Sequence, residues 1–175
     1  SRSSGMYDNA DNIRIAAMSK AGLKRVGMRY RVLHVTGMGT PYNFAWSIDG
    51  LHLYIAYSGD YLQHRICTTP FNTSGSSVNT TWYVNSYDSA FYGVELSPDG
   101  RYIYICGSGL DSVNQFTLTN PHQILQYPNG TTFSAGYEQQ NKRIPNIFNI
   151  GTADANPRGV EFNNDGTKLY MIGFG

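Results

Sequence analysis

Apolar and polar residues alternate with a period of two through much of the chain, and one segment with this pattern occurs three times. The copies are residues 41–59 (PYNFAWSIDGLHLYIAYSG), 91–109 (FYGVELSPDGRYIYICGSG) and 157–175 (PRGVEFNNDGTKLYMIGFG). A period of two is typical of strands with one buried face. In each copy two such runs flank an Asp-Gly pair, whose glycine readily adopts the positive φ of a tight hairpin. Each copy therefore predicts a strand, a turn and a second strand.

More strands are predicted after the first two copies. Residues 61–68 (YLQHRICT) and 112–119 (SVNQFTLT) predict a third strand, and each is followed by a proline. Residues 81–87 (TWYVNSY) and the less regular 131–137 (TTFSAGY) predict a fourth. The Asp-Gly pairs recur after roughly 50 and then roughly 66 residues, and a period near 40–50 residues with four strands per unit is typical of propeller blades. We place the extra length of the second interval in residues 126–156, as an insertion between blades.

These repeats resemble a known family. The pattern P-x-G-V-x-F-x-x-D-G-x-x-L-Y-x-x-G, followed by a strand and a corner with proline, is similar to the YVTN-type β-propeller repeat of bacterial surface proteins and bacteriophage structural proteins. The first copy departs from the pattern, because Asn43 and Tyr57 replace glycines. The third copy matches at Pro157, Gly159, Val160, Phe162, Asp165, Gly166, Leu169, Tyr170 and Gly173, and the second keeps Gly93, Val94, Asp99, Gly100, Tyr104 and Gly107.

The expected fold is therefore all-β. Residues 37–175 should form incomplete β-propeller blades, two nearly complete and a third that stops after its second strand. A blade buries its apolar surface against neighbours on both sides, and closed propellers have about 4–8 blades. We expect either that the chain continues beyond Gly175 or that several copies complete a ring, and we prefer the first alternative.

Residues 1–36 are expected to be a basic N-terminal arm with one β-strand. Residues 1–31 carry seven of the 13 lysines and arginines and two of the 12 acidic residues. Residues 1–12 should be a flexible tail or an extended segment docked on a partner. Residues 13–22 fit either a short helix capped by Asp11 or a strand, and we prefer the helix.

Residues 23–36 of the arm alternate more regularly and predict its strand. Its polar side carries Arg25, Arg29 and Arg31, a candidate docking strip for carboxylates of a partner. The alternative is an edge strand whose charges deter aggregation.

The sequence holds few candidates for chemistry. The net charge of +1 does not favour nucleic acid as a partner, and no apolar run reaches the ~20 residues of a membrane span. His34, His52, His64 and His122 lack the close spacing of a zinc site, so we predict no metal and no cofactor, although residues of different blades could still meet at a metal. Cys67 and Cys106 are expected to be buried as small apolar residues. Asp49, Asp99 and Asp165 should cap the hairpin turns rather than act in catalysis.

Two further sets remain as alternatives. Lactonase-like propellers, which the repeats also resemble, hold calcium with central acids, and Glu95 and Glu161 occupy equivalent positions where the first copy has Ala45. This equivalence favours a repeated structural role. Trp82, Tyr83 and Tyr87, with Phe91 and Tyr92, could form an exposed platform for sugar or protein, or could instead pack between blades.

The preferred function is that of a non-enzymatic structural or binding protein. The resemblance implies a bacteriophage virion component, a tail or capsid appendage, whose arm binds other structural proteins of a large assembly and whose propeller binds a host-surface glycan or protein. The expected location is the virion. The alternatives are a secreted or cell-surface propeller enzyme, lactonase-like or glycan-cleaving, and a bacterial adhesion module.

Overall fold

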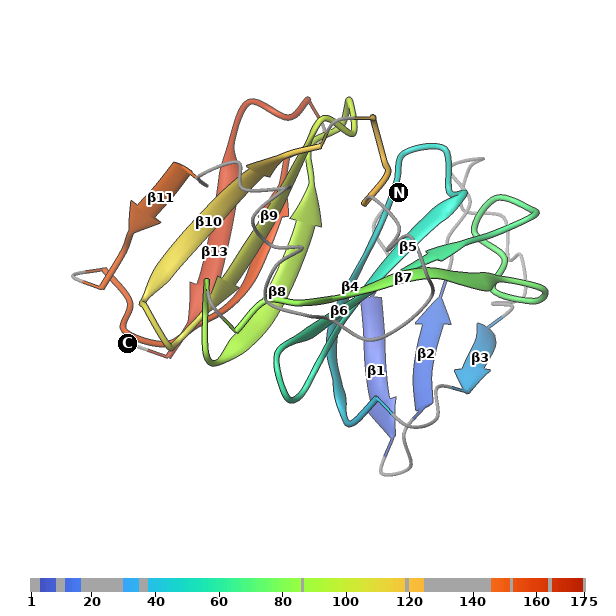
Figure 1. Cartoon of the computed structure of the whole chain (residues 1–175), viewed down its shortest axis with the longest axis horizontal. Helices are drawn as coiled ribbons and strands as arrows, with labels where there is room; N and C mark the ends of the chain where they lie inside the picture. Colours follow the sequence, from blue (N-terminus) through green and yellow to red (C-terminus); the bar gives the residue numbers. More distant parts are fainter. Residues whose placement is uncertain are drawn as a thin grey trace, which may run out of the picture.

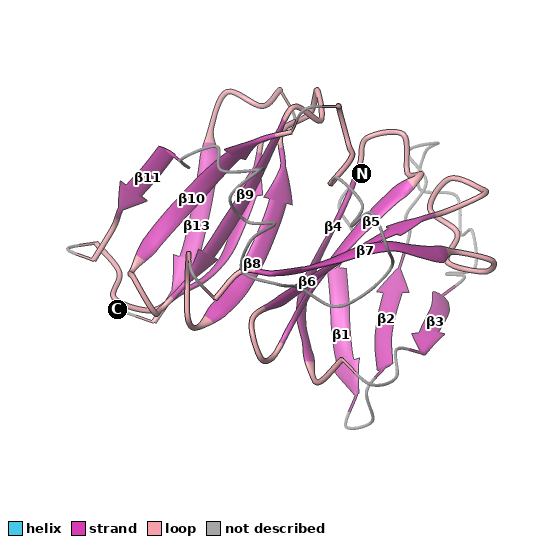
Figure 2. Cartoon of the chain, in the orientation of Figure 1, coloured by secondary structure: helices cyan, strands magenta, loops and turns pink. Residues whose placement is uncertain are grey.

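The computed structural model describes residues 38–85, 87–118, 120–124, 146–151, 153–163 and 165–174, together with the backbone of 4–8, 12–16 and 30–34. All regular elements in these ranges are β-strands, numbered β1 to β13 (Figure 2). Within these ranges no helix is long and apolar enough to cross a membrane. The all-β class that the alternation predicts is therefore confirmed.

The N-terminal strands form a sheet of their own, with the order β1-β2-β3. β1 (Ser4–Asp8) and β3 (Tyr30–His34) both pair antiparallel with β2 (Asn12–Ala16). The helix preferred for residues 13–22 is therefore wrong over the described part of that segment. Ile13 and Ile15 alternate with Arg14, and the ladders on both sides satisfy the backbone of this short stretch better than one helical turn could.

The three repeats form three neighbouring sheets (Figure 1). Blade 1 has the order β4-β5-β6-β7, and blade 2 has the order β8-β9-β10-β11. Blade 3 consists of β12 and β13. Two four-stranded units and one two-stranded unit confirm the predicted blades. The bounds are Pro41–Trp46 (β4), His52–Tyr57 (β5), Tyr61–Ile66 (β6), Ser77–Tyr83 (β7), Phe91–Leu96 (β8), Tyr102–Gly107 (β9), Ser112–Thr117 (β10), Asn146–Asn149 (β11), Pro157–Phe162 (β12) and Leu169–Gly173 (β13).

The fourth strands differ from the prediction. β7 begins at Ser77 and ends at Tyr83, so the strand stops before Val84 of the predicted segment 81–87, and Asn85 and Tyr87 lie in a turn. In blade 2 the strand that pairs with β10 is β11, whereas the predicted segment 131–137 lies outside the described residues. β11 leads into Ile150, just as β7 leads into Val84, and both residues open the same turn. The insertion therefore lies between the third and fourth strands of blade 2, not between blades.

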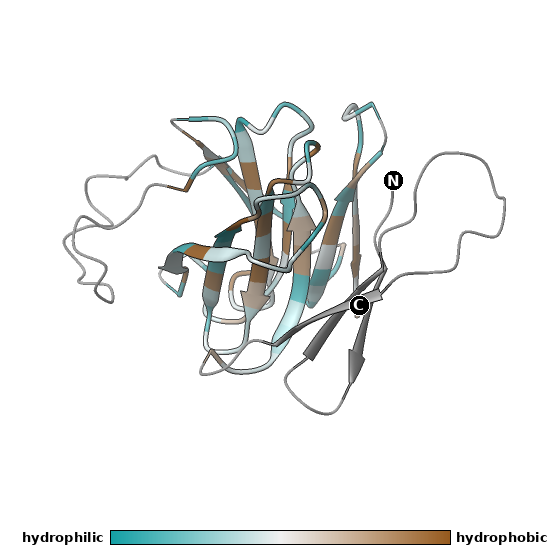
Figure 3. Ribbon diagram, turned by 90° about the vertical axis from the view of Figure 1, so that its right-hand side faces the viewer, coloured by the Kyte–Doolittle hydropathy of each residue, from teal (hydrophilic) through white to brown (hydrophobic). Residues whose placement is uncertain are grey.

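Apolar side chains on the blade faces pack between the sheets. Figure 3 shows hydrophobic positions along the strands that carry them. Between blades 1 and 2, Tyr54 and Ala56 of β5 meet Val94 of β8 and Ile103 and Ile105 of β9, all at most 1% exposed. Between blades 2 and 3, Cys106 and Val113 meet Val160. The strands β4, β8 and β12 lie side by side, since β8 contacts both of the others. Each is the first strand of its blade. Because these strands are neighbours, equivalent residues of the three repeats lie close together.

In blades 1 and 2 the residue after the corner proline contacts the glycine of the Asp-Gly turn. After Pro70 and after Pro121 the next residue has a positive φ, 54° at Phe71 and 61° at His122. Its amide donates to the carbonyl of the hairpin glycine, Gly50 or Gly100, at 2.8 Å in both blades, and its ring covers that glycine. The predicted proline corner thus folds back over the Asp-Gly turn.

Candidate functional site

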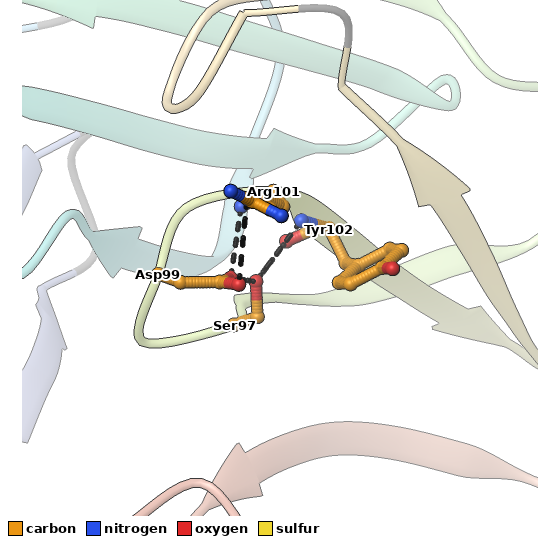
Figure 4. Close-up of polar contacts among 4 residues, drawn as sticks. All are labelled: Ser97, Asp99, Arg101 and Tyr102. Atoms are coloured by element: carbon orange, nitrogen blue, oxygen red, sulfur yellow. Dashed lines mark hydrogen bonds and ion pairs between the residues drawn. The ribbon is translucent and has the colours of Figure 1, made fainter.

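The three repeated aspartates are turn residues, as predicted. Asp99 Oδ1 accepts hydrogen bonds from Ser97 Oγ at 2.6 Å and from the Arg101 amide at 3.1 Å, and the Tyr102 amide donates to Ser97 Oγ at 3.0 Å (Figure 4). The Ser97 hydroxyl, followed by the Arg101 amide, lowers the pKa of Asp99. Asp49 and Asp165 accept the same amide two residues on, at 2.9 and 3.0 Å.

A second feature that the blades share lies at the start of their first strands. Each first strand carries a β-bulge at its second residue, between Pro41 and Asn43, between Phe91 and Gly93, and between Pro157 and Gly159. The bulged residues are Tyr42, Tyr92 and Arg158, and none has a partner in the register of its hairpin. A bulge re-aims its side chain relative to the regular alternation. The same β-bulge therefore changes the direction of one side chain in each blade.

These bulged side chains contact one another across the blades. The rings of Tyr42 and Tyr92 have centroids 5.0 Å apart, and Arg158 Cζ lies 3.7 Å from the centroid of Tyr92. Phe174, just beyond β13, continues the row at 5.7 Å from Arg158 Cζ. We call these four residues the bulge ladder. Its ends are open, since Tyr42 is 38% and Phe174 71% exposed.

Glu95 and Glu161 lie farther along the same strands. Glu95 is half-buried, and its burial, with the nearby charge of Glu161, raises the pKa of Glu95 to about 7. Glu95 Oε1 accepts a hydrogen bond from the Leu96 amide at 2.8 Å. Blade 1 has the buried Ala45 at this position, so the carboxylate is not needed for the strand to pack.

The predicted docking strip of the arm is described only in part. Arg25 and Arg29 lie outside the described residues, and Arg31 lies on β3, where its backbone pairs with Ile15. The role of Arg25, Arg29 and Arg31 in docking stays a prediction.

The three predicted platform aromatics do not share one surface. Trp82 and Tyr87 pack edge to face on Phe116, with centroids 4.8 and 4.9 Å away, at the margin of the core between blades 1 and 2. Tyr83 contacts Tyr61 of its own blade, with centroids 5.1 Å apart. Of the two aromatic residues grouped with them, Phe91 is buried, and Tyr92 belongs to the bulge ladder.

Three histidines that are far apart in the sequence meet at the contact between blades 1 and 2. His52 Nδ1 lies 2.9 Å from His64 Nε2, and the ring of His122 stacks on His52 with centroids 5.7 Å apart. His64 is fully buried and stacks on Tyr54, whose hydroxyl donates to the His122 carbonyl. Burial, and then the neighbouring His52 and His122, lower the pKa of His64 to about 3. In the described residues no three His, Cys, Asp or Glu side chains are grouped so as to hold a metal ion.

Sequence reasoning missed an aspartate that precedes two of the first strands. Asp88 Oδ1 accepts from the amides of Ala90 and Gly109, both at 2.9 Å, and Asp154 Oδ1 accepts from the Asn156 amide at 2.8 Å. A Cβ at Gly107 or Gly173 would collide with this segment, which explains both glycines. In blade 1 the equivalent pair is Met38 and Tyr57, which pack together in an apolar cluster. The sequence signal for this aspartate is the pattern D-x-x-[FP]-x-G-V-E, which residues 88–95 and 154–161 share. It begins three residues before the repeat copies given above.

Comparisons with known proteins agree with this architecture. No family model and no curated protein matches the chain. Among solved structures it is similar to nidogen in a nidogen/laminin complex, with 14% identity over 93% of this chain and 49% of nidogen, and a TM-score of 0.56. It is also similar to a protein from Bacteroides uniformis assigned as a 6-phosphogluconolactonase (20% identity, 98% and 46% coverage, TM-score 0.53). A luciferin-regenerating enzyme aligns with 15% identity, 97% and 52% coverage and a TM-score of 0.51.

These neighbours are β-propeller proteins, and at such low identity they show the fold alone. The chain spans about half the length of each of them. The molecule described above is thus of the β-propeller class.

Proposed function

We propose that this chain is a non-enzymatic binding and structural β-propeller of the YVTN type, carried on a larger assembly by its N-terminal arm. The observation that carries the proposal is the bulge ladder, in which three blades each aim one side chain out of the regular alternation. Loops and bulges placed on a rigid sheet scaffold are the usual sites of binding. The repeated aspartates, in contrast, are occupied in the turns.

The assembly that we favour is a bacteriophage virion. Its support is the resemblance of the repeats to those of phage structural proteins, together with the concentration of positive charge in residues 1–31. In this proposal Arg25, Arg29 and Arg31 bind carboxylates of other structural proteins, and the propeller presents the bulge ladder to a glycan or protein of the host surface.

The test reverses the charge of the arm. We expect the triple variant Arg25→Glu, Arg29→Glu and Arg31→Glu to be lost from purified particles, because it removes three cations and introduces three anions at the docking strip. The matched control replaces the same residues with lysine, which keeps the charge and should enter the particles. Circular dichroism of the isolated variants checks that the blades remain folded. Normal incorporation of the glutamate variant would refute the role of the arm.

A propeller enzyme is the second candidate, favoured by one observation. Glu95 combines partial burial with a neighbouring carboxylate, and a pKa near 7 suits a general acid or base. In that case Glu95→Gln abolishes hydrolysis of lactone or glycoside substrates while leaving folding intact. We expect no such activity in the wild-type chain, and a Glu95-dependent hydrolysis would replace the binding proposal.

A further inference from the structure

We propose that the bulge ladder is a binding site for a sugar acid, a ring compound with a carboxylate attached directly to the ring. The inference rests on the proposed binding function and names the class of ligand for it. It starts from Arg158, which stands where the other two blades carry tyrosine.

Arg158 is a cation without a carboxylate partner in the described part of the chain. The one ion pair of these residues joins Arg101 to Asp99, at the tip of a hairpin. Arg158 instead lies over the face of Tyr92, and its Nε is buried and makes no hydrogen bond. The residue as a whole is only half-buried, and its two terminal nitrogens are not among the buried atoms that lack a hydrogen bond. These nitrogens can therefore meet a ligand.

The aromatic neighbour fixes the direction of these nitrogens. A guanidinium stacked on a ring keeps its edge free, and that edge forms paired hydrogen bonds with a carboxylate. Lysine, with its compact ammonium group, lacks both the stacking face and the fork. The stacking on Tyr92 therefore prepares Arg158 for a planar anion and reduces the ordering cost on binding.

Phe174 supplies the second half of the site. The residue is 71% exposed, and Arg158 Cζ lies over its ring at 5.7 Å from the centroid, so the guanidinium approaches one face of the ring. The exposed remainder of the ring can pack against C–H groups of a pyranose, since both are apolar. The short separation from Arg158 suits a carboxylate borne on the ring itself, whereas an acidic group on a long flexible stem would lose more conformational entropy on binding. A sugar acid meets both requirements at once.

The experiment measures binding of a short oligogalacturonate to the full chain by isothermal titration calorimetry. The same oligomer with its carboxyls methyl-esterified is the neutral probe. We expect the acid form to bind and the ester to bind at least about tenfold more weakly, since a charge-assisted pair with arginine is lost.

The variants locate the site. Arg158→Gln should weaken binding of the acid form by a factor on the order of tenfold to a hundredfold, and Phe174→Ala should weaken both forms. Arg101→Gln, which removes an exposed arginine from the β8–β9 hairpin of blade 2, outside the ladder, should leave binding unchanged. Arg158→Lys should restore only part of the affinity, because the charge remains while the fork is gone.

Three outcomes would overturn the inference: equal binding of acid and ester, full binding by Arg158→Gln, or no binding of either oligomer. None of them bears on the incorporation of the arm variants into particles, so the proposed function stands or falls separately. If whole protein binds host cells and Arg158→Gln binds them equally well, the ladder is not the contact and the propeller binds through another surface.

Discussion

The contact between blades 1 and 2 and the outer face of blade 3 are built from the same repeat but differ in burial. In blade 1 the residues that face the next blade are Tyr54 and Ala56, and both are fully buried. Their equivalents in blade 3 are Tyr170 and Ile172, which are 56% and 71% exposed. The local sequence is alike, but blade 2 covers the first pair. In addition, β5 pairs with β6, whereas β13 pairs only with β12 in the described residues.

This difference shows where the stability of the repeat comes from. A hairpin of this kind supplies turns and ladders by itself, whereas burial of its apolar face depends on the neighbouring blade. Burial of apolar surface stabilises a fold by about 25 cal/mol per Å² removed from water. Most of the stabilisation of a blade therefore comes from the neighbouring blade that covers its apolar face. The exposed face of blade 3 has the chemistry of a contact between blades, and we expect it to behave as surface wherever nothing covers it.

The largest expected difference between the two faces comes from replacing their equivalent tyrosines, Tyr54 and Tyr170. Tyr54→Ala should destabilise the chain by about 3–5 kcal/mol, because it leaves a cavity beside His64 and removes the hydrogen bond to the His122 carbonyl. Tyr170→Ala should change the free energy of unfolding by less than about 0.5 kcal/mol. Urea denaturation followed by tryptophan fluorescence measures both. Similar losses would mean that the face of blade 3 is covered in solution.

The parts of this architecture that could be predicted are those encoded locally. The hairpins follow from alternation and Asp-Gly pairs, and the capping by Asp49, Asp99 and Asp165 follows from side chains two residues from the amides they accept. The third strands were equally visible, because each follows its hairpin within a few residues.

The remaining features depend on contacts across long sequence distances. The fourth strand of blade 2 could not be placed, because the insertion that precedes it hides the period. The histidine cluster joins residues of two blades, which no spacing in the sequence indicates. The bulge ladder was hidden for another reason. A bulge shifts the alternation by one residue, so a strict period of two assigns Tyr42, Tyr92 and Arg158 to the wrong register.

Acid should weaken the contact between blades 1 and 2 through His64. Asn79 Nδ2 donates to His64 Nδ1 at 3.0 Å, so His64 is neutral and a second proton would have to enter a buried ring beside His52 and His122. Its pKa is about 3 in the folded chain and about 6.5 when unfolded. The unfolded chain therefore takes up the proton first, and stability falls as the pH drops from about 6.5 towards about 3.

The variant His64→Gln isolates this effect from that of the aspartates. Between about pH 8 and about pH 4 the wild type should lose on the order of 3 kcal/mol more stability than the variant. Asp49 lies close to the cluster and its pKa is lowered, so it titrates in both proteins and cancels in the difference. His34→Gln, on β3 of a separate sheet, is the control and should keep the acid sensitivity. Parallel pH curves for wild type and His64→Gln would exclude His64 as the source.

The smallest expected difference between blades 2 and 3 concerns their equivalent glycines, Gly93 and Gly159. A Cβ at Gly93 would lie 2.5 Å from Cys106 Sγ and 3.0 Å from the Cα of Gly159, because blade 3 approaches the first strand of blade 2 at this point. A Cβ at Gly159 would meet only Ile172 Cγ2 at 3.3 Å and Asn43 Nδ2 at 3.5 Å, two side-chain atoms. Gly93→Ala should therefore cost about 1–3 kcal/mol by overpacking, and Gly159→Ala less than about 1 kcal/mol.

Blade 1 already carries a side chain at this position, which shows that the bulge does not need a glycine. Asn43 keeps the same bulge and register as the two glycines, and its Oδ1 accepts a hydrogen bond from the Phe44 amide at 2.6 Å. The bulged strand itself therefore accepts a side chain at this position. At Gly93 it is Cys106 and the backbone of blade 3 that leave no room for one. Thermal denaturation of the two alanine variants measures the difference. If Gly159→Ala proves as costly as Gly93→Ala, then a further surface approaches blade 3 as closely as blade 3 approaches blade 2.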